Sequence, residues 1–117
     1  MTAIRLQHED RGGTAVVTVS GEVNIYTAPC LREMLMGFTG SGTGPVPLVV
    51  VMDEVTFLDS TGVGVLVGAM RAQETRGGDF GIVCSSEPVL RVLQTMGLLG
   101  RMGVRGSVDE ALAEVKP

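Results

Sequence analysis

Two hydroxyl side chains, Ser60 and Thr61, follow the carboxylate of Asp59 at a predicted junction between a strand and a helix. The β-branched run at 48–52 predicts a buried strand, and the pattern at 63–76 predicts a helix, so both hydroxyls fall on the first helical turn. Backbone N–H groups are unpaired at this end of a helix and the helix dipole is positive there, so an anion is stabilised. The residues therefore predict either a helix cap or a place where a phosphate can be attached.

Glycines follow these hydroxyls closely. Gly62 and Gly64 are expected to leave the hydroxyls uncovered and to give the backbone of a partner room to approach. Their spacing also suggests a nucleotide-binding loop, but the next glycine is Gly68, which does not fit G-x-G-x-x-G, and no Walker lysine follows. The pattern therefore favours glycines that permit close packing or close approach, and no cofactor is expected.

Groups for catalysis or metal binding are scarce. His8 is the only histidine and falls on a predicted edge strand, so Ser60 lacks the base of a hydrolase triad and no metal site is expected. Cys30 and Cys84 are too few for a disulfide scaffold, and we expect two buried, reduced thiols. These residues argue against an enzyme.

The composition limits the class of protein. The 117 residues suffice for a single domain over 1–117, and the apolar content of 44% excludes a disordered chain. The net charge is −4 and the nine basic residues are scattered, so no nucleic-acid surface is expected. No apolar run approaches the roughly 20 residues that span a bilayer, and no signal-peptide pattern follows Met1. We therefore expect a cytoplasmic protein without a membrane segment.

Hydrophobic periodicity predicts an α/β protein. Strands are predicted at 4–8, 14–20, 48–52, 80–84 and 102–104. Helices are predicted from a cap at Thr27 to about 38, at 60–76, from Pro88 to Gly97, and after a Ser107–Glu110 capping box. The first two strands form a hairpin, 21–24 breaks the second strand, and 40–45 is a flexible loop. The later alternation implies a mixed, mostly parallel central sheet with about four helices.

A polar cluster is expected at one end of this sheet. Loops at the carboxyl ends of parallel strands gather on one side, so Glu22, Asn24 and Thr27 should lie near Ser60. The cluster has no catalytic base or metal ligand set. It therefore suits recognition by another protein better than chemistry of its own.

Two segments match a known pattern. Residues 21–33 are similar to G-E-[LIV]-D…[ST]-A-P-x-L-R-E, and 57–68 contain F-[LM]-D-S-[ST]-G-[LV]-G-V-L. Gly97-Leu98 is similar to a G-L that ends a helix in the same proteins. On these residues the chain resembles, over essentially its whole length, the bacterial anti-sigma factor antagonists, which are single STAS-domain proteins of partner-switching pathways.

The resemblance implies a phosphorylation switch. In this family the anti-sigma factor is itself a GHKL-type ATP-dependent serine kinase, and it phosphorylates the serine after the aspartate. A PP2C-type phosphatase restores the serine. The unphosphorylated antagonist binds the anti-sigma factor and releases a sigma factor to RNA polymerase. Ser60 is then the implied phosphorylation site, and Thr61 is secondary because its hydroxyl is expected to bond a first-turn N–H group.

The implied partner-binding residues lie in the two matching segments. They are Glu22, Asn24, Thr27, Asp59, Ser60, Thr61, Gly62, Val63 and Gly64. Asn24 stands where the family usually has an aspartate, and its effect stays open. Two other functions also stay open: a STAS scaffold subunit of a larger sensory assembly, and a small nucleotide-binding protein, which the missing Walker lysine disfavours.

Overall fold

The computed structural model describes residues 4–39 and 46–115. The strands are β1 (Ile4–Arg11), β2 (Thr14–Val23), β3 (Leu48–Leu58), β4 (Phe80–Val83) and β5 (Val104–Arg105). The helices are α1 (Ala28–Thr39), α2 (Ser60–Thr75), α3 (Glu87–Thr95) and α4 (Val108–Glu114).

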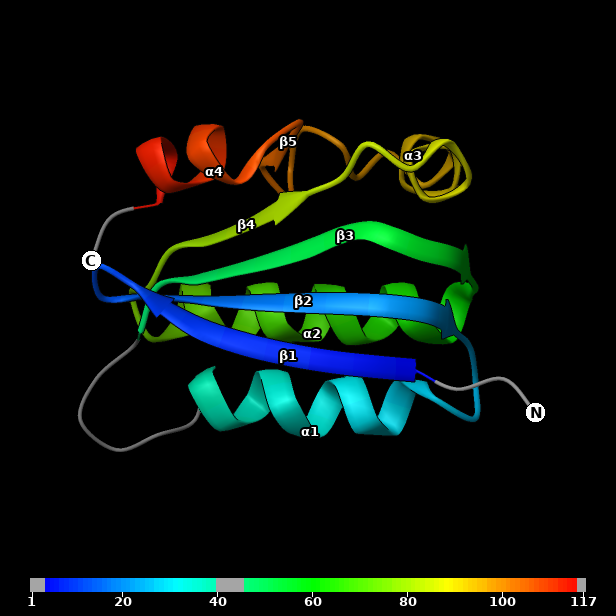
Figure 1. Cartoon of the computed structure of the whole chain (residues 1–117), viewed down its shortest axis with the longest axis horizontal. Coiled ribbons are helices and arrows are strands. Elements are labelled where there is room, and N and C mark those ends of the chain that lie inside the picture. Colours follow the sequence, from blue (N-terminus) through cyan, green and yellow to red (C-terminus); the bar gives the residue numbers. More distant parts are fainter. Residues whose placement is uncertain (1–3, 40–45, 116–117) are drawn as a thin grey trace.

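The strands form one sheet in the order β1-β2-β3-β4-β5 (Figure 1). β1 is antiparallel to β2, and the remaining neighbours are parallel. The predicted α/β class, the N-terminal hairpin and the mixed, mostly parallel sheet with four helices are confirmed. The predicted flexible loop at 40–45 lies outside the described residues.

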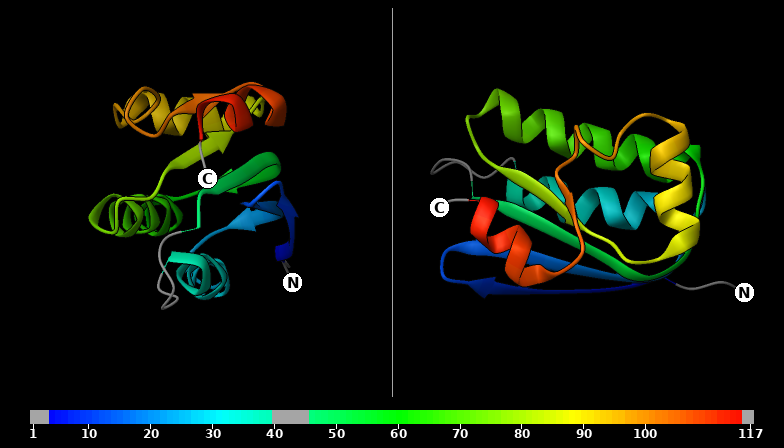
Figure 2. Two further views of the ribbon diagram at one scale, coloured as in Figure 1. Left: turned by 90° about the vertical axis from the view of Figure 1, so that its left-hand side faces the viewer. Right: turned by 90° about the horizontal axis from the view of Figure 1, so that it is seen from above.

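Helices cover the sheet on both faces. α1 and α2 lie side by side against one face, and α4 lies against the other (Figures 1 and 2). Successive side chains of a strand point to opposite faces, so Val17 and Val19 enter the main core while Val16 belongs to a second cluster with Ala111 of α4. Burial on both faces explains why the central strands are nearly continuous apolar runs.

β2 extends beyond its predicted end. The expected break at 21–24 is wrong, because β2 continues to Val23. Gly21 has a φ of 98°, which favours glycine, and the pairing register with β3 shifts twice near this residue. Because of these irregularities, β2 continues through residues 21–23, and Glu22 pairs with Phe57 of β3.

The C-terminal end of α2 is firmly attached to the sheet. Gly77, with a φ of 76°, and Gly78, whose N–H donates to the Gln73 carbonyl at 2.8 Å, close the helix as predicted. The Gln73 side chain is fully buried, and its Nε2 donates to the backbone carbonyls of Val46 and Asp79, each at 2.8 Å. The end of α2 is therefore bound to the segments that lead into β3 and β4.

The two cysteines differ in environment. Cys84 is buried, and desolvation raises the pKa of its thiol. Cys30 is exposed, so the prediction of two buried thiols is wrong for this residue. The next residue, Leu31, takes the position in the core, and Cys30 lies on the outer side of α1.

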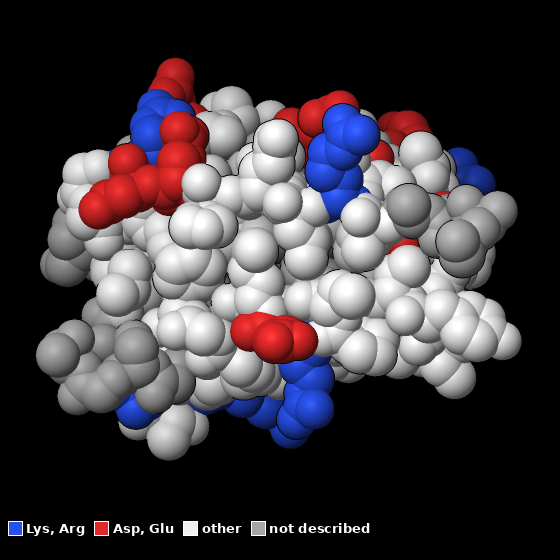
Figure 3. Space-filling view, turned by 60° about the horizontal axis from the view of Figure 1, so that its bottom comes forward, with Lys and Arg blue, Asp and Glu red and all other residues white. Residues whose placement is uncertain are grey.

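Charged side chains are spread over the surface. On the face in Figure 3, basic and acidic side chains lie beside one another in small separate groups, and the basic ones form no continuous band. No helix in the described part of the chain is long and apolar enough to cross a bilayer. Nor do residues 4–39 and 46–115 bring together three or more His, Cys, Asp or Glu able to hold a metal ion.

Candidate functional site

The first turn of α2 presents two hydroxyls beside a capping carboxylate. Asp59 has an extended backbone, and its Oδ1 accepts a hydrogen bond from the Gly62 N–H at 3.0 Å. Ser60 and Thr61 are exposed, and among the described residues neither hydroxyl has a hydrogen-bond partner. The expectation that Thr61 bonds a first-turn N–H is therefore wrong, because Asp59 fills that role and leaves both hydroxyls available.

The end of β2 lies beside this helical turn. Val23 pairs with Leu58, and its carbonyl oxygen accepts a hydrogen bond from the Asp59 N–H at 3.1 Å. Glu22, half-buried, precedes Val23 and leads into the loop before α1. The structure thus brings Glu22 and Ser60 to one end of the sheet, as the parallel topology predicts.

Asn24 and Thr27 brace the loop between β2 and α1. Asn24 Oδ1 accepts hydrogen bonds from the N–H groups of Tyr26 at 2.9 Å and Thr27 at 3.1 Å. The Asn24 N–H donates to Thr27 Oγ1 at 2.9 Å, and that hydroxyl donates to the Glu22 carbonyl at 2.8 Å. Thr27 is therefore a buried positioning residue and not the expected side-chain cap of α1. An aspartate at position 24 offers the same acceptor oxygen, so Asn24 preserves the loop geometry.

Gly62 and Val63 of the predicted partner-binding set are buried, as Thr27 is. Val63 is only 1% exposed, and a Cβ on Gly62 would lie 2.6 Å from both Leu58 Cδ1 and Val23 Cγ1. The prediction that Gly62 gives a partner room is therefore wrong, because this glycine lets α2 pack closely on the sheet. Gly64 is exposed with open space around it, so close approach by a partner stays a prediction there.

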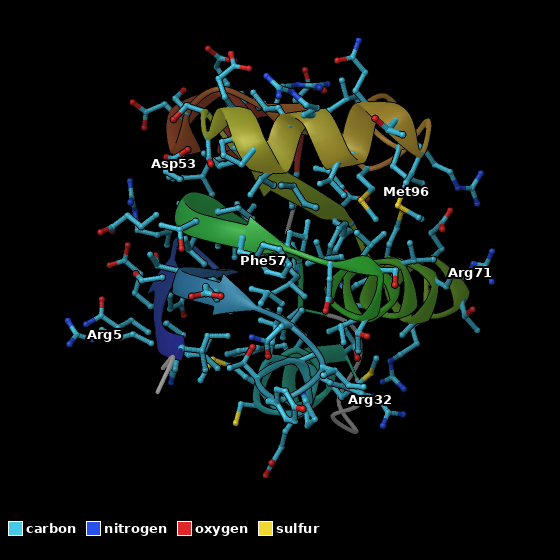
Figure 4. The ribbon with its side chains drawn as sticks, turned by 90° about the vertical axis from the view of Figure 1, so that its right-hand side faces the viewer. Arg5, Arg32, Asp53, Phe57, Arg71 and Met96 are labelled. Atoms are coloured by element: carbon cyan, nitrogen blue, oxygen red, sulfur yellow. The ribbon has the colours of Figure 1, made fainter. Side chains whose placement is uncertain are left out.

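Sequence reasoning missed the apolar side chains at this end. Ile25, Tyr26 and Phe57 are exposed, and Phe57 lies near the middle of the end-on view in Figure 4. The sequence contains one sign of this surface: two large apolar residues, Ile25 and Tyr26, lie between the polar residues Asn24 and Thr27. Such residues are ordinarily assigned to a core, so the sequence alone did not mark them as surface.

A groove of about 500 Å³ runs between α1 and α2 and reaches the first turn of α2. Arg32, Met36 and Thr61 contribute to its lining. Arg32 therefore places a guanidinium group on the same groove as the Thr61 hydroxyl, and Figure 4 shows Arg32 at the margin of this end of the molecule.

Comparison with known proteins identifies the family. The STAS domain family matches residues 5–111. The chain is 34% identical over 82 residues to an anti-sigma-B factor antagonist of Bacillus subtilis, covering 70% of this chain and 72% of that protein. It is 33% identical over 93 residues to an anti-sigma-B factor antagonist of Staphylococcus aureus, covering 80% and 84%.

A solved structure agrees with these relatives. The crystal structure of an anti-sigma factor antagonist from Mycobacterium paratuberculosis has a TM-score of 0.88 to this chain at 29% identity. The match covers 98% of this chain and 96% of that one. Sequence motif, family match and fold agree over nearly the whole chain, and the chain belongs to the STAS-domain family of anti-sigma factor antagonists.

Proposed function

We propose that this chain is an anti-sigma factor antagonist whose binding is switched off by phosphorylation of Ser60. The observation that carries the proposal is the exposed Ser60 hydroxyl on the first turn of a helix that Asp59 caps. Among the described residues this hydroxyl has no hydrogen-bond partner, so modification removes no bond that the fold uses. Ser60 therefore suits a reversible change that alters the surface and leaves the fold intact.

The energetics of a phosphate favour such a switch. A phosphate adds about −1.5 to −2 charge at neutral pH, and at a helix N-terminus it is tolerated or favoured by up to roughly 1 kcal/mol. At a docked interface an unpaired charge costs about 2 to 5 kcal/mol, which lowers affinity about 30-fold to several thousand-fold. The Asp59 carboxylate beside Ser60 adds like-charge repulsion. Binding is therefore lost while the fold is retained.

The proposed partners follow from the family. An anti-sigma factor with GHKL-type kinase activity binds the unphosphorylated chain and phosphorylates Ser60, and a PP2C-type phosphatase reverses the modification. Binding releases a sigma factor in the cytoplasm. The chain itself acts as a binding module in this cycle and not as an enzyme.

A kinase assay tests the proposal directly. Each GHKL-type anti-sigma factor kinase of the source cell is incubated with the protein and ATP, and the phosphate is mapped by mass spectrometry. We expect one phosphate on Ser60, its absence in Ser60→Ala, and its presence in Thr61→Ala. Loss of binding between that kinase and the phosphorylated protein completes the test.

Other results would overturn the proposal. Modification confined to Thr61 would move the switch to the neighbouring hydroxyl. If no kinase modifies or binds the chain and its native mass is that of a large assembly, a scaffold subunit replaces the antagonist. Tight binding of a nucleotide by the chain alone would instead support the nucleotide-binding alternative.

A further inference from the structure

Three exposed apolar side chains occur at the Ser60 end of the sheet. Ile25 is 61% exposed, Tyr26 is 87% exposed and Phe57 is 46% exposed. We refer to these three residues as the apolar patch. Among the described residues the only other large apolar side chain with comparable exposure is Met96 at the end of α3, which Figure 4 shows at the same end of the molecule but outside these three residues. Exposed apolar groups that gather at one end of a protein indicate an interaction surface.

The apolar patch is held in place by its own backbone. Asn24 Oδ1 accepts the Tyr26 N–H, and the Thr27 hydroxyl bridges Asn24 to the carbonyl of Glu22. Phe57 lies in β3, where it pairs with Glu22 of β2. Side chains presented from a fixed backbone lose little freedom on binding, which favours a specific contact.

The charges within the two segments that carry the apolar patch have one sign. The segments 21–27 and 53–61 contain Glu22, Asp53, Glu54 and Asp59 and no lysine or arginine. Figure 4 shows Phe57 near the middle of this end, with Arg5, Arg32 and Arg71 at its margins. A complementary partner surface therefore has basic side chains around an apolar pocket.

We infer that the apolar patch is the anchor by which the chain selects its anti-sigma factor, whose binding surface has an apolar pocket surrounded by basic residues. The inference rests on the proposed function and separates two tasks within one surface. The phosphate state of Ser60 decides whether binding occurs. Ile25, Tyr26 and Phe57 decide which protein is bound.

Affinity measurements with three variants test the inference. The probe is the purified anti-sigma factor kinase that phosphorylates Ser60, used without ATP and titrated by calorimetry at two salt concentrations. Tyr26→Ala is expected to weaken binding by at least about 30-fold, because an aromatic side chain that fills a partner's pocket typically contributes this much. Glu22→Gln is expected to remove part of the salt dependence, and Met96→Ala to leave affinity within about twofold.

Two further variants test the loop between β2 and α1. Asn24→Ala removes the acceptor for the Tyr26 N–H but no apolar side chain, and it is expected to weaken binding by about 10-fold through loss of the fixed loop. Asn24→Asp keeps an acceptor oxygen and is expected to bind like the natural chain within about threefold. Thermal unfolding of Tyr26→Ala, Glu22→Gln, Met96→Ala and Asn24→Asp is expected to match that of the natural chain within about 2 °C, so their affinities report the surface. Asn24→Ala loses the acceptor for the N–H groups of Tyr26 and Thr27 and is expected to unfold a few degrees lower while it remains folded at the temperature of the titration.

The possible failures are distinct. If Ser60 is phosphorylated and the kinase binds Tyr26→Ala as tightly as the natural chain, the inference is wrong while the proposed function stands. An equal loss with Met96→Ala also overturns it, because the effect would not be confined to the apolar patch. If no kinase binds the natural chain, the proposed function fails and the inference fails with it.

Discussion

The two ends of α2 are built in opposite ways. At the N-terminal end, one carboxylate caps the helix and leaves Ser60 and Thr61 exposed. At the C-terminal end, the side chain of Gln73 is buried and donates two hydrogen bonds to neighbouring segments. The hydroxyls at the N-terminal end can be modified without loss of a hydrogen bond within the described part of the protein, whereas Gln73 at the C-terminal end attaches the helix to the segments before β3 and β4.

This difference between the two ends suits the proposed phosphorylation of Ser60. A modified residue changes only its surroundings when its own interactions are with solvent. The groups that keep the helix in place are then other residues, such as Gln73 at its far end and Gly62, which packs closely on the sheet. Substitution of the exposed hydroxyls should therefore be less destabilising than substitution of either of these residues.

The largest effect is expected at Gln73. Gln73→Ala leaves a cavity and removes the side-chain N–H group that donates to the carbonyls of Val46 and Asp79. The Asp79 carbonyl still accepts a hydrogen bond from the Leu48 N–H at 3.1 Å. We expect the free energy of unfolding in urea to fall by about 2 to 4 kcal/mol. The matched change at an exposed glutamine, Gln94→Ala, should alter it by less than about 0.5 kcal/mol. Equal effects of the two changes would remove the contrast between the two ends.

Gly62 and Gly64 give the next contrast, two residues apart on one helix. Gly62→Ala places a methyl group against Leu58 and Val23 and should destabilise the protein by about 1 to 3 kcal/mol. Gly64→Ala meets no atom within 4 Å and should stabilise the exposed helix by about 0.5 to 1 kcal/mol. Thermal unfolding should show a lower melting temperature for Gly62→Ala and a higher one for Gly64→Ala than for the natural chain. A Gly62→Ala protein as stable as the natural chain would contradict the close packing of α2 on the sheet.

A smaller effect is expected for the cap. Asp59→Ala removes the acceptor for the Gly62 N–H and should lower the free energy of unfolding by about 1 kcal/mol. Asp59→Asn keeps an acceptor and should retain most of that stability. Urea unfolding compares the two. If Asp59→Ala is as stable as Asp59→Asn, another group caps α2 in solution.

The smallest effect on stability belongs to Ser60. Ser60→Asp places a carboxylate at the helix N-terminus and should change the free energy of unfolding by less than about 1 kcal/mol, in the stabilising direction. The same variant should lose binding to the anti-sigma factor, whereas Ser60→Ala should keep it. A clear fall in melting temperature for Ser60→Asp would mean that lost binding reflects unfolding, and the separation of switch and fold would not hold.

Much of the fold could be predicted from local patterns. Gly77-Gly78 ends α2, and Ser107 caps α4 by accepting the Glu110 N–H at 3.2 Å, because these caps depend on neighbouring residues alone. The end of β3 could not be predicted in this way. Asp53 and Glu54 look like the end of a strand, yet pairing with β2 continues to Leu58.

The candidate site was predicted in part for the same reason. Strand order alone brings the Glu22 loop near Ser60, so that placement followed from topology. The burial of Gly62 depends on how closely α2 approaches the sheet, which no local pattern encodes. The exposure of Tyr26 was missed because apolar residues are ordinarily counted toward the core.

The hydrogen bonds of the loop before α1 have an evolutionary consequence. They use the side chains of Asn24 and Thr27 and the backbone of Tyr26, so the side chains of Ile25 and Tyr26 are not needed for the loop to form. Substitution of Ile25 or Tyr26 therefore changes the surface and leaves the hydrogen bonds of the loop intact. If the proposed function and the inferred role of the apolar patch hold, two copies of such a chain can diverge here after gene duplication while both keep Ser60. Two signalling pathways in one cell would then use separate partners through differences at these two positions.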